Sequence, residues 1–131
     1  MPRCTVIPVL SYPNLDQAID WLCGTFGFTL RLKIGNHRAQ LNVGDGAVAL
    51  TQRDSGDKTD TADSLMVRVE NVHRHHEHAR SRGARIVQPP ADHPYGERQY
   101  TVEDFAGRRW TFSQSIADVA PEQSGGSPGQ L

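Results

Sequence analysis

The chain has 131 residues, a formal net charge of −1 and 37% hydrophobic residues. This length predicts one compact domain, and the near-zero charge argues against electrostatic binding to nucleic acid or to an anionic membrane. Two cysteines are too few for a disulfide framework, and free thiols are typical of the reducing cytoplasm. No apolar run approaches the roughly 20 residues of a membrane span. We therefore expect a cytoplasmic protein with neither nucleic-acid nor membrane partners.

The first half of the chain predicts a strand, a helix and three further strands. Apolar and β-branched residues over 4–10 indicate a strand, and the SYPN tetrapeptide at 11–14 is expected to form a turn. Its last residue can cap a helix over 15–26, which Gly27 then ends. Alternating apolar and polar residues with intervening turn residues predict further strands over 28–34, 37–43 and 47–52.

The same order of elements returns after a polar, loop-like stretch over 53–63. A strand is predicted over 64–69, followed by a helix over 71–82 that Asn71 caps and Gly83 ends. The remaining elements are a strand over 84–88, a turn-rich loop over 89–97, and a final hairpin with strands over 98–103 and 108–114.

The two halves therefore read as a tandem repeat. Gly27 and Gly83 are separated by nearly the same number of residues as the hairpin residues Val43 and Val102. One half is too small to bury its own sheet, so modules over 4–52 and 64–114 are expected to share a single domain over 1–115. Residues 116–131 are rich in Ser, Gly and Pro and predict a flexible C-terminal tail.

Three segments resemble the vicinal oxygen chelate superfamily, which includes glyoxalase I, extradiol dioxygenases, fosfomycin resistance enzymes and bleomycin-resistance proteins. Residues 7–28 are similar to the family's opening strand and helix, 65–87 to its second opening unit, and 95–114 to its closing hairpin. Phe105 stands where the family usually has proline. The last segment is most similar to the metal-poor, PhnB-like or bleomycin-resistance-like branch.

The resemblance implies an α+β fold, in which tandem β-α-β-β-β modules curl eight strands into a cup that holds a small molecule. It also implies a homodimer. Strand alternation predicts that Trp110 and Phe112 pack under a helix, while polar residues between such positions line the cup. The expected polar residues of the cup are Thr51, Ser64, Arg68, Arg109, Thr111 and Ser113. Ala47, Ala49 and Met66 are expected on the same side of their strands.

Metalloenzymes of the superfamily place His, Gln or Glu at four strand positions. The corresponding residues here are Ile7, Thr51, Ser64 and Thr111, and none is a competent ligand for a divalent ion. We therefore expect no metal in the cup and a binding protein rather than an enzyme. The alternative is a metal-dependent lyase, isomerase or dioxygenase of the same superfamily. Acid–base chemistry would need a carboxylate in the cup, for which the sequence offers Glu97 and Glu103.

Four histidines crowd the predicted second helix, at His73, His75, His76 and His78. Their spacing of three residues brings some pairs to one helix face, where a metal site is one interpretation. The favoured interpretation is a solvated helix whose inner face contains Val72, Ala79 and one of the two central histidines.

The loop before the final hairpin supplies the other candidate ligand contacts. Tyr95 could stack on a planar ligand, and Arg98 or Arg109 could bind an acid group in bidentate fashion. The alternatives are that Tyr95 only anchors its loop and that Arg98 forms a salt bridge with Glu97 or Glu103. The sequence thus predicts a metal-free protein that binds a planar or acidic small molecule, and that could sequester an antibiotic.

Overall fold

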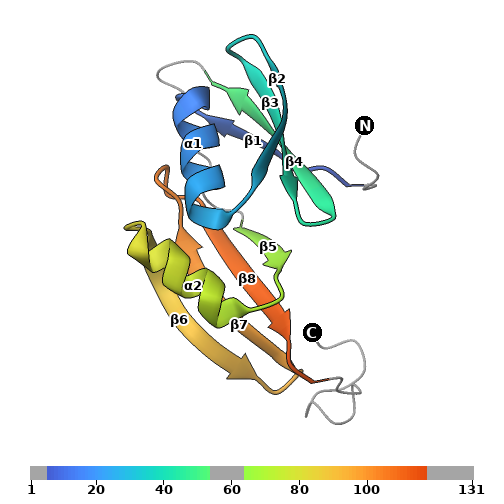
Figure 1. The fold of residues 1–131 in the computed structure, drawn as a ribbon, viewed down its shortest axis with the longest axis vertical. Helices are drawn as coiled ribbons and strands as arrows, with labels where there is room; N and C mark the ends of the chain where they lie inside the picture. The colour runs from blue at the N-terminus through green and yellow to red at the C-terminus, as the bar shows by residue number, and fades with distance from the viewer. Residues whose placement is uncertain (1–5, 54–63, 118–131) are drawn as a thin grey trace. The chain divides into compact units, whose positions relative to one another are not determined.

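The computed structural model describes residues 6–53 and 64–117, and these divide into two compact units. The first unit comprises the described residues up to 53 together with the hairpin turn Asp104–Arg108, and the second comprises residues 64–103 and 109–117. Each unit contains one helix and one four-stranded sheet (Figure 1). The α+β class and the tandem β-α-β-β-β order are therefore as predicted.

In the first unit, helix α1 (Leu15–Phe26) packs on a sheet of order β1-β4-β3-β2. The helix begins at Asn14, whose side chain accepts the Gln17 amide, and ends at Gly27, whose φ of 81° suits a residue without Cβ. Strand β1 pairs in parallel with β4, and the other pairs are antiparallel. The strands are β1 (Val9–Tyr12), β2 (Thr29–Ile34), β3 (Arg38–Val43) and β4 (Gly46–Gln52).

In the second unit, helix α2 (Val72–Ser81) lies across one face of a sheet of order β5-β8-β7-β6 (Figure 1). Val72 and Ala79 of α2 are fully buried and form the core of this unit together with Tyr100, Trp110 and Phe112. The strands are β5 (Ser64–Arg68), β6 (Arg85–His93), β7 (Glu97–Glu103) and β8 (Arg109–Ser115).

The first strand differs from the prediction. It was expected over 4–10 with a turn at 11–14, whereas β1 runs through Ser11 and Tyr12. These two residues pair with Thr51 and Gln52, because β4 is long enough to offer them partners, and Tyr12 is fully buried. Residues 4 and 5 and most of the predicted 53–63 loop lie outside the described residues.

Strand β6 is the largest departure from the prediction. It was expected over 84–88 before a long loop over 89–97, but it continues to His93 through two consecutive prolines. Proline cannot donate to a sheet ladder, but β6 is an edge strand that pairs only with β7. The pairing register shifts between Gln88 and Ala91, which takes the prolines out of the ladder. The predicted loop therefore shrinks to residues 94–96.

The predicted tail begins with two ordered residues. The amides of Ile116 and Ala117 donate to the Gly96 carbonyl at 2.9 and 3.3 Å. The rest of the predicted flexible segment 116–131 lies outside the described residues.

The hairpin turn at 104–108 is fastened by aromatic and polar contacts within the first unit. The Phe105 ring stacks on Tyr12 at 5.5 Å between centroids and lies 5.8 Å from Trp21. The Tyr12 hydroxyl donates to Asp104 Oδ2 at 2.7 Å. Burial, followed by the Asp104 charge, raises the Tyr12 pKa well above its usual range. These contacts explain why an aromatic residue suits position 105, where the family pattern has proline.

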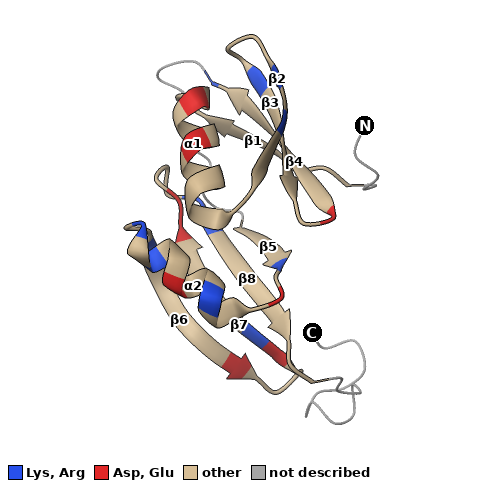
Figure 2. Cartoon of the chain, viewed as in Figure 1, with Lys and Arg blue, Asp and Glu red and all other residues tan. Residues whose placement is uncertain are grey.

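Charged residues of both signs are distributed over both units (Figure 2). Helix α1 carries acidic residues, whereas α2 carries both acidic and basic ones. This mixture agrees with the net charge of −1. Among the described residues, no helix combines the length and the apolar character that crossing a bilayer would require.

Candidate functional site

The sheet of the second unit has two chemically different faces. Tyr100, Trp110 and Phe112 are almost fully buried and share the face that α2 covers, where the His75 ring contacts both Tyr100 and Phe112. Alternation puts the residues between them on the opposite side of the sheet. We call this side the polar face. It consists of Ser64, Met66, Arg68, Glu97, Gln99, Thr101, Glu103, Arg109, Thr111 and Ser113.

Five of the six polar residues predicted for the cup, Ser113 among them, lie on the polar face. Ser64 pairs with Arg109 at one end of the β5–β8 ladder, while Thr111 and Arg68 lie further along it. Thr111 also exchanges a hydroxyl hydrogen bond of 2.9 Å with Thr101. The sixth residue, Thr51, belongs to the first unit, where it pairs with Ser11 and Arg38. The role of these residues in ligand binding stays a prediction.

Tyr95 borders the polar face from the turn between β6 and β7. Its ring stacks on His93, with centroids 5.1 Å apart and planes inclined by 10°. Its hydroxyl donates to Gln99 Oε1 at 3.2 Å. Tyr95 is nevertheless 38% exposed, and Met66, which lies within 4.0 Å of the Gln99 amide nitrogen, is 65% exposed. The tyrosine is thus held in place while leaving aromatic surface accessible.

Arg98 is not on the polar face. It alternates with Gln99 along β7 and therefore shares the α2 side with Tyr100. Its guanidinium binds Asp92 through two hydrogen bonds, of 2.6 and 3.2 Å, and this contact lowers the Asp92 pKa. The predicted salt-bridge partners, Glu97 and Glu103, were wrong. Asp92 lies directly opposite Arg98 in β6, a stretch that the sequence had suggested was loop.

A chain of side-chain hydrogen bonds crosses the polar face. The Tyr95 hydroxyl donates to Gln99, the Gln99 amide donates to Ser113 Oγ at 3.1 Å, and Ser113 Oγ donates to Glu97 Oε1 at 3.1 Å. The sequence analysis placed Ser113 in the cup but did not single out Gln99. Strand alternation alone would have placed Gln99 beside Thr101, but the register that brings it opposite Ser113 comes from the folded hairpin.

Two carboxylates on the polar face are more covered than the arginines near them. The Glu97 side chain is 20% exposed and lies 3.9 Å from Arg68, whose side chain is 79% exposed. Glu103 is similarly covered and lies 3.6 Å from Arg85 and 3.7 Å from Arg109. The acids are therefore fixed in the sheet surface, while the arginines extend from it.

The residues that the resemblance places at the four metal positions of the superfamily do not include a ligand for a divalent ion. Thr51, Ser64 and Thr111 present neutral hydroxyl groups, and Ile7 presents only carbon. Zn²⁺ and similar ions need imidazole, thiolate or carboxylate ligands. Within residues 6–53 and 64–117, no group of three or more His, Cys, Asp or Glu side chains is arranged to hold a metal.

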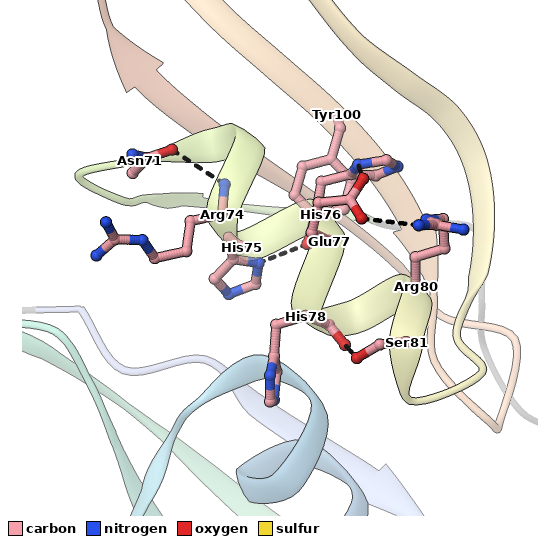
Figure 3. Close-up of polar contacts among 9 residues, drawn as sticks. All are labelled: Asn71, Arg74, His75, His76, Glu77, His78, Arg80, Ser81 and Tyr100. Atoms are coloured by element: carbon pink, nitrogen blue, oxygen red, sulfur yellow. Dashed lines mark hydrogen bonds and ion pairs between the residues drawn. The ribbon is translucent and has the colours of Figure 1, made fainter.

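The histidines of α2 point in different directions (Figure 3). His75 Nδ1 hydrogen-bonds the Tyr100 hydroxyl, and its ring centroid lies 4.0 Å from that of Phe112. His76 packs edge-on against Tyr100 at 5.2 Å, so both central histidines, rather than one, contact the inner face. His78 points away from Tyr100 (Figure 3). Burial raises the Tyr100 pKa above its usual range. The two histidines therefore contact a buried, neutral tyrosine of the core.

Comparison with known proteins agrees with this architecture. The family model described as "Glyoxalase/Bleomycin resistance protein/Dioxygenase superfamily" matches residues 5–112. The crystal structure of TioX from Micromonospora sp. ML1 is 33% identical, with a TM-score of 0.74, covering 89% of this chain and 100% of that chain.

Two further solved structures show the same fold at lower identity. A glyoxalase/bleomycin resistance protein/dioxygenase from Nocardioides is 20% identical, covers 100% of this chain and 91% of that chain, and has a TM-score of 0.69. UcmS2 is 18% identical, covers 86% of this chain and 99% of that chain, and has a TM-score of 0.64. A search of curated proteins found no match.

Proposed function

Because the chain belongs to the Glyoxalase/Bleomycin resistance protein/Dioxygenase superfamily, we propose that it is a small-molecule binding protein that works without a metal. The observation that carries this proposal is the chemistry of the polar face. Hydroxyl groups stand at the two positions of this sheet that the resemblance assigns to metal ligands, Ser64 and Thr111. The exposed Met66 shares their face, and the exposed Tyr95 borders it. Without a Lewis acid, affinity must come from apolar contact and a few polar anchors.

The ligand that suits this surface is planar. Tyr95 is already stacked on His93 and hydrogen-bonded to Gln99, so stacking a further ring on it costs little side-chain entropy. Arg109 lies on the polar face and is more than half exposed, which makes it the candidate partner for an acid group on the ligand. Sequestration of an antibiotic is the biological role that we propose, on the resemblance to the bleomycin-resistance branch.

We expect Tyr95→Ala and Arg109→Lys each to weaken ligand binding roughly tenfold, equivalent to about 1.4 kcal/mol. The first change removes the stacking surface, and the second removes the planar fork that binds an acid at two points. The measurement is calorimetry with confirmed hits from a thermal-shift screen of aromatic acids and antibiotics. Arg98→Lys is the matched control, since Arg98 lies on the α2 side, and it should leave affinity unchanged. If Tyr95→Ala and Arg109→Lys bind the ligand as tightly as Arg98→Lys and the wild type do, neither Tyr95 nor Arg109 is an anchor.

We expect purified, untagged protein to contain far less than one Zn, Ni, Mn or Fe atom per chain. The physical reason is the set of hydroxyl and apolar groups at the metal positions. Elemental analysis after gel filtration makes the measurement. About one metal atom per chain, lost on changing Glu97 and Glu103 to Gln, would contradict the proposal and favour a metalloenzyme. Metal lost only in a His75→Gln, His76→Gln variant would place it on α2 instead.

We also propose that the protein is a cytoplasmic homodimer. Cys23, a free thiol among the described residues, is compatible with a reducing compartment. Strands β1, β2, β5 and β6 are edge strands of their sheets, and such edges need to be covered or blunted. Sedimentation velocity at micromolar concentration should give a species of about twice the chain mass of 14.5 kDa. A species near the single-chain mass that does not change with dilution would argue against the dimer.

A further inference from the structure

The surroundings of Glu97 differ from those of an ordinary surface carboxylate. Four-fifths of its side chain is covered, and Ser113, which is itself 2% exposed, donates to its Oε1 atom. Both groups belong to adjacent strands of one sheet, so their positions are set by the backbone. The carboxylate is therefore preorganised in one conformation. A ligand that binds it does not have to pay the entropy of ordering the Glu97 side chain.

The hydrogen-bond chain that ends at Glu97 has a direction. Tyr95 donates to Gln99, Gln99 donates to Ser113, and Ser113 donates to the carboxylate. Every donor on this path points toward the negative charge. The end of the chain at Glu97 thus presents a hydrogen-bond acceptor, to which a group carrying N–H donors is complementary.

The positive partner of Glu97 is held much less firmly. Arg68 approaches to 3.9 Å, near the outer limit of an ion pair, and 79% of its side chain is exposed. Such a contact contributes little, because solvent screens it and a long side chain must be ordered to keep it. Glu103 differs in this respect, since Arg85 and Arg109 both approach it, at 3.6 and 3.7 Å. Among the described carboxylates of the polar face, Glu97 is therefore the one whose negative charge is least neutralised by nearby arginines.

We propose that Glu97 determines specificity by binding a cationic nitrogen on a planar ligand whose ring lies against Tyr95. This inference rests on the proposed function and names the ligand chemistry that one end of its site recognises. A ligand cation replaces Arg68 on the carboxylate, and the arginine moves into solvent, where its aliphatic stem is tolerated. The exposed face of an aromatic ring attracts the same cation, so stacking and ion pairing act together.

The test uses two fluorescent probes with one ring system and opposite charges, 9-aminoacridine and acridine-9-carboxylate. Glu97→Gln keeps the shape of the side chain and removes its charge. We expect it to weaken 9-aminoacridine binding about tenfold or more, and to leave acridine-9-carboxylate within about twofold of the wild type. Glu103→Gln is the matched control and should leave both probes within about twofold. Thermal midpoints of all variants check that the fold is retained.

Four results would overturn the inference. Unchanged 9-aminoacridine binding in Glu97→Gln, or an equal loss for both probes, would show that the Glu97 charge does not select the ligand. Binding of acridine-9-carboxylate alone by the wild type would also refute it, while leaving the proposed binding function intact. If neither probe binds at millimolar concentration, the proposed planar-ligand site fails together with the inference.

Discussion

Trp110→Ala is expected to lower the free energy of unfolding by about 3–5 kcal/mol, the usual cost of truncating a large buried aromatic residue. Trp110 is fully buried on the α2 side of β8 and is aligned with Phe112, with planes inclined by 9°. Its cross-strand partners Val102 and Leu65 cannot close the space that an alanine would leave, because their positions are fixed by two ladders.

Thr111→Ala is the matched control one residue further along the strand. Thr111 is only partly buried on the polar face, and its hydroxyl bonds Thr101. Losing that bond should cost about 1 kcal/mol or less, since water can reach the remaining hydroxyl. Urea denaturation of the three proteins makes the comparison. Equal midpoints for the two variants would contradict the assignment of faces, and with it every residue of the polar face, because strand alternation links them.

The sequence predicted the order of elements well because local signals agree with the tertiary contacts. Asn14 and Asn71 cap the two helices, and Gly27 and Gly83 follow them with positive φ. These are interactions between neighbours in the chain, so spacing alone reveals them. Strand β6 was misjudged because Pro89 and Pro90 normally signal a loop. Only the sheet order shows that they lie on an edge strand.

The candidate site was predictable only in part, for a related reason. Alternation along β5 and β8 correctly placed Ser64, Arg68, Arg109 and Thr111 on one face. The salt-bridge partner of Arg98 was predicted wrongly because Asp92 belongs to the misjudged part of β6. The bond from Ser113 to Glu97 depends on which residues of β7 and β8 lie opposite each other. Cross-strand register is a long-range property, and the sequence reports it weakly.

The contacts of Asp104 at the turn 104–108 predict a second large effect on stability. Asp104 is 4% exposed, and its carboxylate accepts hydrogen bonds from the Tyr12 hydroxyl and from the amides of Ala106 and Arg108. The Arg108 side chain is also buried, with its guanidinium 5.2 Å from the centre of the Tyr12 ring. One carboxylate thus shapes the turn and accepts the hydroxyl hydrogen of a buried tyrosine.

Asp104→Ala is therefore expected to destabilise the protein by about 3–5 kcal/mol, because it leaves the buried Tyr12 hydroxyl and two turn amides without their acceptor. Asp104→Asn keeps an oxygen for the turn amides and should cost less. Tyr12→Phe removes one bond to the carboxylate and should cost about 1–3 kcal/mol. Equilibrium denaturation at neutral pH gives all three values, and a loss below 1 kcal/mol for Asp104→Ala would show that the turn does not depend on this residue.

The same contacts predict how stability responds to alkali. The folded protein holds the Tyr12 proton more tightly than the unfolded chain does, because burial and the Asp104 charge raise the Tyr12 pKa. The stabilisation linked to this proton is complete below the ordinary tyrosine pKa of about 10, and it is lost as the pH rises above that value toward the folded pKa. Tyr12→Phe has no such proton, so its unfolding free energy should fall less steeply above pH 10 than that of the wild type. Tyr100 and Cys23, whose pKa values are also raised, still titrate in both proteins and contribute to the slope that remains. Parallel slopes for the two proteins would mean that Tyr12 loses its proton as readily in the folded state as in the unfolded one.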